Sequence, residues 1–411
     1  MNKIAVGGAG IVGICTAFFL QKSGFEVTLI DKEQPGTMTS YGHACTFADY
    51  ASIPVNSPRL FRDIPIMLLK RNAPLSVDFF YILKNLSWCI NFLKNCRQDK
   101  VANISASLGD FLQHANIYYD KIFEEVDVKK YIKNEEVLYL YETKKAYEAA
   151  KPSTLQRIKN GIEVRQMNIE EIKELEPNLA PVYYKGEIFK GSRHTTNPLA
   201  ISNKIFKYFI NSGGKFLQKK ITNVNHSEDK VKLSFDIETE SYDKFVVCTG
   251  AWSNIIANYI GDDFPLDTER GYHVLFKNKE QLINRPVGWS EFGIYLVQIE
   301  EGIRAAGTVE IAGLNKKPNK KRIKMIENQA RKVLPALAEV KKEWIGFRPT
   351  LPDSLPVIGN SLKNKRIVYA FGHQHLGWTL GAVTGNVVES LIKEQQPNID
   401  IKAFSPDRFL N

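Results

Sequence analysis

A glycine-rich turn near the start of the chain has the residue types and spacing that bind a dinucleotide. Gly8, Gly10 and Gly13 form the pattern G-x-G-x-x-G, directly after a short apolar strand and at the beginning of a helix. Asp31 follows the second strand at about the expected 20-residue spacing. The first glycine makes the tight turn, the second lets the backbone approach a pyrophosphate, and the helix N-terminus favours its negative charge. We expect Asp31 to accept hydrogen bonds from ribose hydroxyls.

The elements that position this turn alternate between strand and helix, which predicts an α/β fold. Residues 3–7 and 25–30 are predicted strands on either side of a helix over residues 11–23. A second nucleotide-type segment covers residues 245–253, and a third glycine cluster, residues 372–379, precedes a C-terminal helix. Three such segments far apart in the sequence favour a long cofactor, FAD, over NAD.

Composition indicates a large globular protein. The chain has 411 residues, of which 44% are hydrophobic and 24% charged, and this excludes disordered and collagen-like chains. The net charge of +10 permits attraction to anionic ligands or lipid surfaces. No basic stripe with interleaved aromatic residues supports nucleic-acid binding. The five cysteines are scattered and form no CxxC pair, so neither a metal site nor a disulfide framework is expected.

The sequence predicts a cytoplasmic protein. The apolar run over residues 4–20 contains glycines at meaningful spacing, and no Ala-x-Ala cleavage site follows it, so a signal peptide is disfavoured. No run of about 18 apolar residues predicts a membrane-spanning helix. Basic residues punctuate a predicted helical region over residues 58–132. This region is compatible with peripheral association at the inner face of the cytoplasmic membrane, but solvated helices packed over a sheet are the favoured interpretation.

Eight motifs follow one another along nearly the whole chain. They are the glycine turn at residues 8–13 and the segments 39–44, 247–253, 269–273, 304–310, 346–359, 372–379 and 404–409. In this order they resemble the FAD-dependent D-amino acid oxidase/dehydrogenase superfamily. The segments over 269–273 and 376–379 are most similar to the bacterial D-amino acid dehydrogenase small-subunit branch.

The resemblance implies which residues hold FAD. The pyrophosphate and ribose would be bound by Gly8, Gly10, Ile11, Val12, Gly13, Asp31 and Lys32. The adenine and flavin would be contacted by Thr39, Ser40, His43, Ala44, Val224, Gly250, Trp252, Gly372, Leu376, Gly377, Trp378 and Thr379. Members that bind flavin covalently carry a cysteine near Gly346. Because none is present here, we expect FAD to be bound non-covalently.

The resemblance also implies a substrate site with three catalytic candidates. Arg348 would clamp the substrate carboxylate through two parallel hydrogen bonds, and a structural ion pair is the alternative. Tyr272 would add its hydroxyl to the same carboxylate, with a purely structural strand aromatic as the alternative. His375 would handle a proton or polarise the amine. Glycine oxidases have an arginine where His375 stands, so substrate choice cannot be transferred from them.

The implied activity is oxidation of the CH–NH group of a D-amino acid, including a cyclic one such as D-proline or hydroxyproline. Hydride would pass to flavin N5, and the imine would hydrolyse to a 2-oxo acid and ammonia. One alternative is a glycine- or sarcosine-type oxidase. Another is a flavoprotein subunit of a hetero-oligomeric amine dehydrogenase. The electron acceptor, oxygen or a respiratory acceptor, and any partner subunits stay open.

The implied architecture is a Rossmann-like FAD-binding domain with a discontinuous, mixed-sheet substrate domain of α+β type. We expect the chain to pass between the two domains four times. The FAD-binding domain would comprise residues 1–57, 151–262 and 344–411. The substrate domain would comprise residues 58–150 and 263–343.

Overall fold

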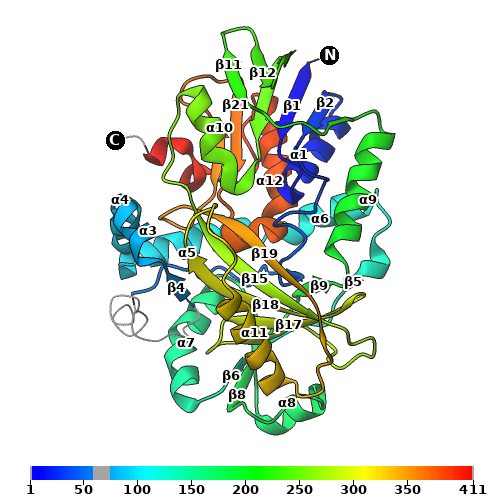
Figure 1. The fold of residues 1–411 in the computed structure, drawn as a ribbon, viewed down its shortest axis with the longest axis vertical. Coiled ribbons are helices and arrows are strands. Elements are labelled where there is room, and N and C mark those ends of the chain that lie inside the picture. Colours follow the sequence, from blue (N-terminus) through cyan, green and yellow to red (C-terminus); the bar gives the residue numbers. More distant parts are fainter. Residues whose placement is uncertain (1, 59–74, 410–411) are drawn as a thin grey trace.

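The computed structural model describes residues 2–58 and 75–409, and the chain forms two halves, each built on a sheet (Figure 1). Part of the predicted helical region, residues 59–74, lies outside the described residues. Within the described ranges, no helix has both the length and the apolar character needed to cross a membrane.

The first half is organised around a mostly parallel sheet. Among the described residues it has six strands in the order β10-β2-β1-β14-β21-β20, of which only β20 runs antiparallel. The strands are β1 (Lys3–Gly7), β2 (Glu26–Ile30), β10 (Lys215–Leu217), β14 (Lys244–Val247), β20 (Val357–Asn360) and β21 (Ile367–Phe371). Since β1, β14 and β21 are adjacent and parallel, their carboxyl ends meet at one edge.

Helices pack against this sheet. The turn after β1 leads into α1, which lies against α12 at a close crossing, because a Cβ at Gly385 would lie 2.8 Å from the backbone of Cys15. The helices are α1 (Ile11–Lys22), α9 (Pro198–Asn211), α10 (Ser253–Ile260) and α12 (Gly377–Ile392). A small antiparallel sheet is formed by β11 (Asn223–His226), β12 (Val231–Phe235) and β13 (Glu238–Tyr242).

The second half contains a larger mixed sheet. In the described part of the chain it has nine strands, with the path β19-β15-β18-β17-β16-β6-β8-β7 and β4 beside β18. The strands are β4 (Leu75–Val77), β6 (Val137–Tyr141), β7 (Val164–Met167), β8 (Lys185–Phe189), β15 (Asp267–Phe276), β16 (Val287–Trp289), β17 (Ile294–Ile299), β18 (Gly302–Ile311) and β19 (Val340–Thr350). Around it are α7 (Lys144–Lys159), α8 (Ile169–Leu175) and α11 (Lys320–Val333).

The remaining elements connect the halves. A short antiparallel sheet contains β3 (Thr46–Phe47), β5 (Ile132–Lys133) and β9 (Arg193–Thr195). The connecting helices are α3 (Phe79–Lys84), α4 (Leu86–Lys94), α5 (Gln98–Leu112) and α6 (Ala115–Phe123). Short 3-10 turns are η1 (Lys129–Tyr131), η2 (Gly250–Trp252), η3 (Gln374–Leu376), η4 (Lys402–Phe404) and η5 (Pro406–Phe409).

The mixed α/β class and the parallel first sheet are as predicted, but two expected domain boundaries are displaced. The boundary at residue 150 falls inside α7, and the strands β7 and β8 that follow it belong to the larger sheet. The boundary at 344 falls inside β19, an unbroken strand of the same sheet. Neither position has a turn signal. The pairing partners β6 and β15 determine where these strands belong.

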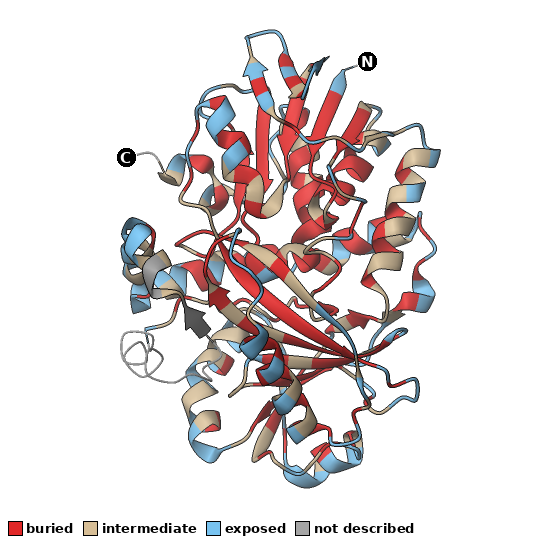
Figure 2. Cartoon of the chain, in the orientation of Figure 1, coloured by how far each residue is buried: buried red, intermediate tan, exposed pale blue. Residues whose placement is uncertain are grey.

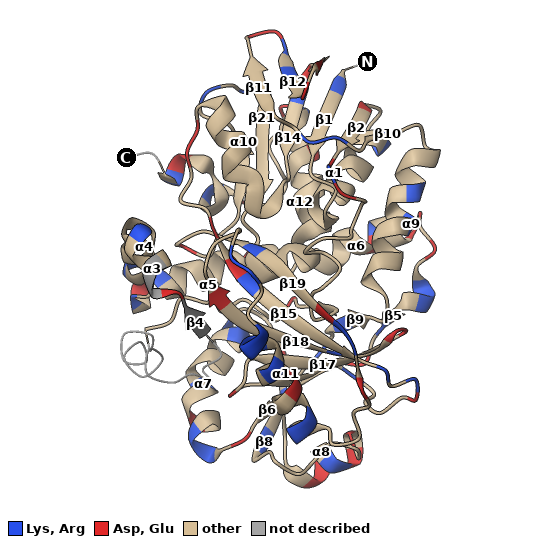
Figure 3. Ribbon diagram, viewed as in Figure 1, with Lys and Arg blue, Asp and Glu red and all other residues tan. Residues whose placement is uncertain are grey.

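The buried hydrophobic residues of the described chain form three large clusters, one on each face of the first sheet and one in the second half. Figure 2 shows that the central strands of both sheets are buried along most of their length, whereas the outer faces of α7, α8 and α11 are exposed. Figure 3 shows Lys and Arg on α7, α9 and α11, together with scattered acidic residues. In this view the positive charge is therefore distributed over both halves of the molecule.

Candidate active site

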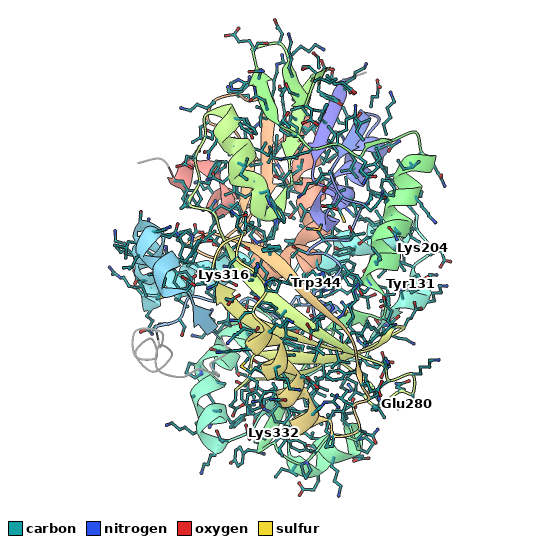
Figure 4. The ribbon with its side chains drawn as sticks, in the orientation of Figure 1. Tyr131, Lys204, Glu280, Lys316, Lys332 and Trp344 are labelled. Atoms are coloured by element: carbon teal, nitrogen blue, oxygen red, sulfur yellow. The ribbon has the colours of Figure 1, made fainter. Side chains whose placement is uncertain are left out.

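A cavity of about 900 Å³ is lined by residues from both halves. Its walls come from the turn after β1, the loop over residues 38–55, η2, the strands β15, β18 and β19, and residues 370–378. Trp344, labelled on β19 in Figure 4, belongs to this wall. Ligands of open α/β sheets bind beyond the carboxyl ends of the strands, and three strands of the first sheet end here. The cavity is therefore the candidate active site.

The glycine turn has the geometry that its sequence predicts. Gly8 has φ +103°, a left-handed conformation that favours glycine, and a Cβ there would lie 2.3 Å from the Cys248 carbonyl oxygen. A Cβ at Gly13 would lie 1.8 Å from the Gly8 carbonyl oxygen, so this glycine allows α1 to pack against the turn. Gly13 lies behind the cavity wall, which includes Gly8, Gly10, Ile11 and Val12.

Two hydroxyl side chains fix the loop that covers this turn. Ser40 Oγ accepts a hydrogen bond from the Ile11 N–H at 2.9 Å, at the N-terminus of α1. Thr39 Oγ1 donates to the Phe347 carbonyl oxygen at 3.1 Å and so joins the loop to β19. Ser40 thus places a polar oxygen where the helix N-terminus favours negative charge.

Asp31 lies at the same end of the cavity. It accepts hydrogen bonds from the Ala9 N–H at 2.7 Å and the Glu33 N–H at 2.9 Å, while burial raises the pKa of its carboxyl. Lys32 lies over the Trp252 ring, with Nζ 5.5 Å from the ring centroid. The structure brings together here Asp31, Lys32, Gly250 and Trp252.

His43 presents an unsatisfied donor in the middle of the cavity. Its ring stacks on Trp378, with centroids 4.4 Å apart. Nδ1 accepts the Cys45 N–H at 3.0 Å, which leaves the proton on Nε2, and Nε2 is buried without a partner in the described chain. Burial, with help from Arg304, lowers the pKa of His43 well below its ordinary value, so the ring is neutral. His43 and the adjacent Ala44 line the cavity.

Of the predicted cofactor-binding residues over 372–379, some line the cavity and others lie behind its wall. Gly377 and Trp378 line the cavity at the N-terminus of the helix. Thr379 instead accepts a hydrogen bond from the Ala48 N–H at 2.9 Å. Residues of this segment that lie behind the wall are Gly372, Leu376 and Thr379. The expectation that these three contact the cofactor directly therefore stays a prediction, while the structure places them one layer behind the wall.

Val224 is also displaced from its predicted place. It is buried in β11, where it pairs with Leu233, and it does not line the cavity. The wall includes Lys219, Lys220 and Ile221 instead. These residues belong to the connection between β10 and β11, which contains no helix or strand.

Arg348 lies at the opposite end of the cavity. Its Nη1 donates to the Thr308 carbonyl oxygen at 3.0 Å, and within the described residues no carboxylate forms an ion pair with it. Glu269 faces it across the strand pair β15–β19, and burial raises the pKa of Glu269 to about 7 in spite of the charge on Arg348. The Thr308 hydroxyl is buried here without a partner. Arg348 thus retains N–H groups for a ligand, and the structural ion pair considered from sequence is not formed.

Tyr272 does not offer its hydroxyl proton to a ligand. The hydroxyl donates to Glu310 Oε2 at 2.5 Å and accepts the Asn319 N–H at 3.1 Å. Glu310 also lies 3.3 Å from Arg270, so the tyrosine belongs to a buried polar cluster between the sheet and α11. The predicted carboxylate contact is corrected accordingly: the ring of Tyr272 contributes to the wall, and its hydroxyl supports Glu310.

His375 faces the open cavity. The surrounding protein atoms, and then the nearby Arg348, lower the pKa of His375 to about 4. The imidazole is therefore neutral at pH 7, where it can donate or accept one hydrogen bond but adds no positive charge.

Aromatic residues form one wall of the cavity, and of these only Tyr50 was expected from the sequence, at the substrate entrance. Tyr50 and Phe189 stack at 4.3 Å, and Tyr139 and Tyr295 lie 5.9 Å apart beside them. A second guanidinium, Arg157 on α7, is next to this aromatic wall. No motif marks these residues, because strands and a helix distant in sequence bring them together.

The two ends of the cavity fit a dinucleotide cofactor with a substrate beside it. Gly10 lines the cavity at the N-terminus of α1, and only Ser40 Oγ, at 3.4 Å, lies within 4 Å of a Cβ added there, so the bare backbone leaves room for a pyrophosphate beside the helix N–H groups. Buried Nε2–H of His43 and Nε1–H of Trp378 lack partners in the described chain, as expected where a polar ring system binds.

Comparison with known proteins agrees with this fit. A sequence model for the family described as FAD dependent oxidoreductase (DAO) matches residues 3–391. The chain belongs to this family. It is therefore an FAD-dependent oxidoreductase, and FAD is the dinucleotide that the cavity fits.

The relatives of this oxidoreductase are named for amino-acid oxidation. It is 33% identical to a D-amino-acid oxidase of Bradyrhizobium diazoefficiens, over 100% of this chain and 99% of the relative. It is 26% identical to a D-amino acid dehydrogenase of Vibrio vulnificus, over 98% of this chain and 100% of the relative. The crystal structure of a glycine oxidase from Geobacillus kaustophilus superposes with a TM-score of 0.77 at 17% identity, with full coverage of both chains, and so shows the same fold.

Proposed function

We propose that this flavoenzyme oxidises the CH–NH group of a D-amino acid to an imine, which hydrolyses to a 2-oxo acid and ammonia. The observation that carries the proposal is Arg348: a guanidinium that forms no ion pair with any described residue, inside the cavity that also contains the dinucleotide turn. The 33% identity to a D-amino-acid oxidase supports the stereochemical assignment. FAD, when bound, accepts the hydride at its N5 atom.

The protein's own residues supply binding and orientation. Arg348 holds the substrate carboxylate, and its hydrogen bond to the Thr308 carbonyl fixes the guanidinium on the strand. The aromatic wall of Tyr50, Phe189 and Tyr295 excludes water and accommodates an apolar or ring-shaped part of the substrate, and cyclic D-proline and hydroxyproline therefore belong among the test substrates. Holding the reacting atoms in place contributes most of the rate enhancement that this arrangement can provide.

At the cofactor end, the proposed binding residues are those that reach the wall. The α1 N-terminus with Gly8 and Gly10 would hold the pyrophosphate, and Asp31 the ribose. The N-terminus of α12, at Gly377 and Trp378, would stabilise negative charge on the flavin ring. None of these contacts requires a covalent link, so FAD should be released when the protein is denatured in acid.

Anaerobic reduction of the flavin tests the proposal. The holoenzyme is mixed with D- and L-isomers of the common amino acids, both prolines, glycine and sarcosine, and the loss of flavin absorbance is followed. Reduction by D-isomers and not by their mirror images is expected. Reduction by glycine or sarcosine alone would replace the proposal with the glycine- or sarcosine-type alternative. Measuring peroxide formed in air then separates an oxidase from a dehydrogenase.

A further inference from the structure

A second guanidinium lies in the same cavity as Arg348. Arg157, near the end of α7, lines the wall, and its guanidinium carbon lies 5.2 Å from the centroid of the Phe189 ring. Its Nε is buried and has no hydrogen-bond partner within the described chain. Stacking on an aromatic face fixes the plane of a guanidinium and leaves its edge free to bind an anion. Arg157 is therefore held in place as a donor whose acceptor is not part of the described protein.

The neighbouring carboxylates do not form an ion pair with Arg157. Glu187, on the same strand as Phe189, accepts hydrogen bonds from the hydroxyls of Tyr141 at 2.7 Å and Thr154 at 2.9 Å. Across residues 2–58 and 75–409, no carboxylate forms an ion pair of 4.0 Å or less with the Arg157 guanidinium, and its Nε has no hydrogen-bond partner. The groups that face it are the phenols of the aromatic wall, whose hydroxyls are neutral at pH 7 because burial raises their pKa.

The charge at the substrate end is thus positive. This end of the cavity contains the guanidinium groups of Arg348 and Arg157, while the histidines at 373 and 375 are neutral. Among the described side chains that line this end, the acidic one is Glu269, which burial leaves only partly ionised at neutral pH; Glu187 and Glu291 lie near Tyr139 but do not line the cavity. An amino acid with a neutral side chain brings only one carboxylate. When that carboxylate binds Arg348, the guanidinium of Arg157 has no ion-pair partner in the cavity. A substrate with two carboxylates neutralises both.

We propose that Arg157 binds a second carboxylate of the substrate and that this enzyme prefers dicarboxylic amino acids. This inference rests on the proposed function, in which Arg348 binds the first carboxylate. The aromatic wall between Tyr50 and Phe189 then packs against the methylene groups that separate the two acids. D-aspartate and D-glutamate place the second acid on the side chain, and an N-carboxymethyl amine places it on nitrogen. Both kinds of substrate therefore carry one amine and two carboxylates.

Substrate pairs that differ only in charge test this inference. Wild type and Arg157→Met are compared in anaerobic flavin reduction by D-glutamate and D-glutamine, by D-aspartate and D-asparagine, and by iminodiacetate. Wild type is expected to favour the acid of each pair. Arg157→Met should lower kcat/KM for the acids about 10- to 100-fold, the usual effect of losing a charge-assisted contact, and change that for the amides less than about threefold. D-Glutamate and iminodiacetate show whether the second acid belongs on carbon or on nitrogen.

Arg193 is the matched control. It is another guanidinium stacked on phenylalanine, 5.2 Å from the Phe47 ring centroid, but it pairs with Asp120 at 2.6 Å and does not line the cavity. Arg193→Met should leave the acid-to-amide ratio unchanged. Equal use of D-glutamate and D-glutamine by wild type, or an equal loss for both substrates in Arg157→Met, would overturn the inference.

A binding measurement keeps the inference testable if Arg157→Met does not fold or no amino acid reduces the flavin. Glutarate and butyrate are titrated into wild-type holoenzyme while the flavin spectrum is recorded. Glutarate is expected to bind at least about tenfold more tightly, because it contacts both guanidinium groups. Equal affinities would refute the role of Arg157. Absence of flavin reduction by every amino acid, with glutarate still favoured, would instead reject the proposed function and retain the dicarboxylate site.

Discussion

Replacing two glycines of the same turn by alanine should impair different properties: the stability of the apoprotein at Gly13 and the affinity for FAD at Gly10. At Gly13 the added Cβ would lie 1.8 Å from the Gly8 carbonyl oxygen and 3.0 Å from its carbon, so α1 must move by more than about 1 Å. Overpacking of this kind costs about 1–3 kcal/mol. For a chain of this size, that lowers the melting temperature of the apoprotein by roughly 1–4 °C. Weaker FAD binding follows as a secondary effect.

At Gly10 the apoprotein has room for the methyl group. Its φ of −72° and ψ of 176° suit any residue, and only Ser40 Oγ, at 3.4 Å, lies within 4 Å of the added Cβ. Gly10→Ala should therefore change the stability of the apoprotein by less than about 1 kcal/mol. Because Gly10 lines the cavity at the N-terminus of α1, the methyl group occupies the space through which a pyrophosphate approaches the backbone. FAD affinity should fall at least about tenfold.

Two measurements on each variant separate these effects: thermal unfolding of the apoprotein by circular dichroism, and titration of the apoprotein with FAD by fluorescence quenching. The expected pattern is a lowered melting temperature in Gly13→Ala and a weakened FAD titration with a normal melting temperature in Gly10→Ala. If Gly10→Ala melts as early as Gly13→Ala, or binds FAD like wild type, the assignment of the cofactor to this turn is refuted.

Three further predictions concern the other end of the cavity. Arg348→Lys should raise KM for the amino acid about 10- to 100-fold with unchanged FAD affinity, because an ammonium cannot make two parallel bonds; an unchanged KM in steady-state kinetics would remove Arg348 from the site. Tyr272→Phe should leave KM unchanged and reduce the free energy of unfolding by about 1–3 kcal/mol, since Glu310 loses a donor; a tenfold rise in KM would restore the predicted carboxylate contact. Burial raises the pKa of Glu269 from 4.5 to about 7, so the folded chain keeps a proton that the unfolded chain loses, and stability falls as pH rises through this range. In Glu269→Gln, the plot of melting temperature against pH should be flatter between about pH 4.5 and 7 than in wild type. An unaltered plot would show that Glu269 is not the group responsible.

The sequence predicted those parts of the site that depend on local geometry. The glycine turn, the helix after it and Asp31 follow from spacing within about 30 residues, because a tight turn and a helix N-terminus are properties of a short segment. Arg348 was found through its place in a motif, and the structure confirms that it lies in the cavity.

What the sequence could not predict depends on partners far along the chain. The role of the Tyr272 hydroxyl is decided by Glu310 and Asn319, which come from the neighbouring strand and from the beginning of α11. The displacement of Val224 depends on where β11 begins, a boundary that no turn signal marks. Arg157 lies on a largely exposed helix with Pro152 in its interior, and nothing in that segment predicts that one of its side chains reaches a cavity.

The order of strands in the first sheet bears on when the protein can mature during its synthesis. β1, which is synthesised before the other strands of this sheet, lies between β2 and β14, and the strand beyond β14, β21, ends only at Phe371. Through most of translation, the nascent chain therefore contains β1 and β2 without the rest of their sheet. Such exposed apolar strands favour binding by chaperones. The wall segment before α12 emerges later still. Acquisition of FAD should consequently be a post-translational event, and overproduced protein should accumulate as apoprotein whenever flavin supply falls behind synthesis.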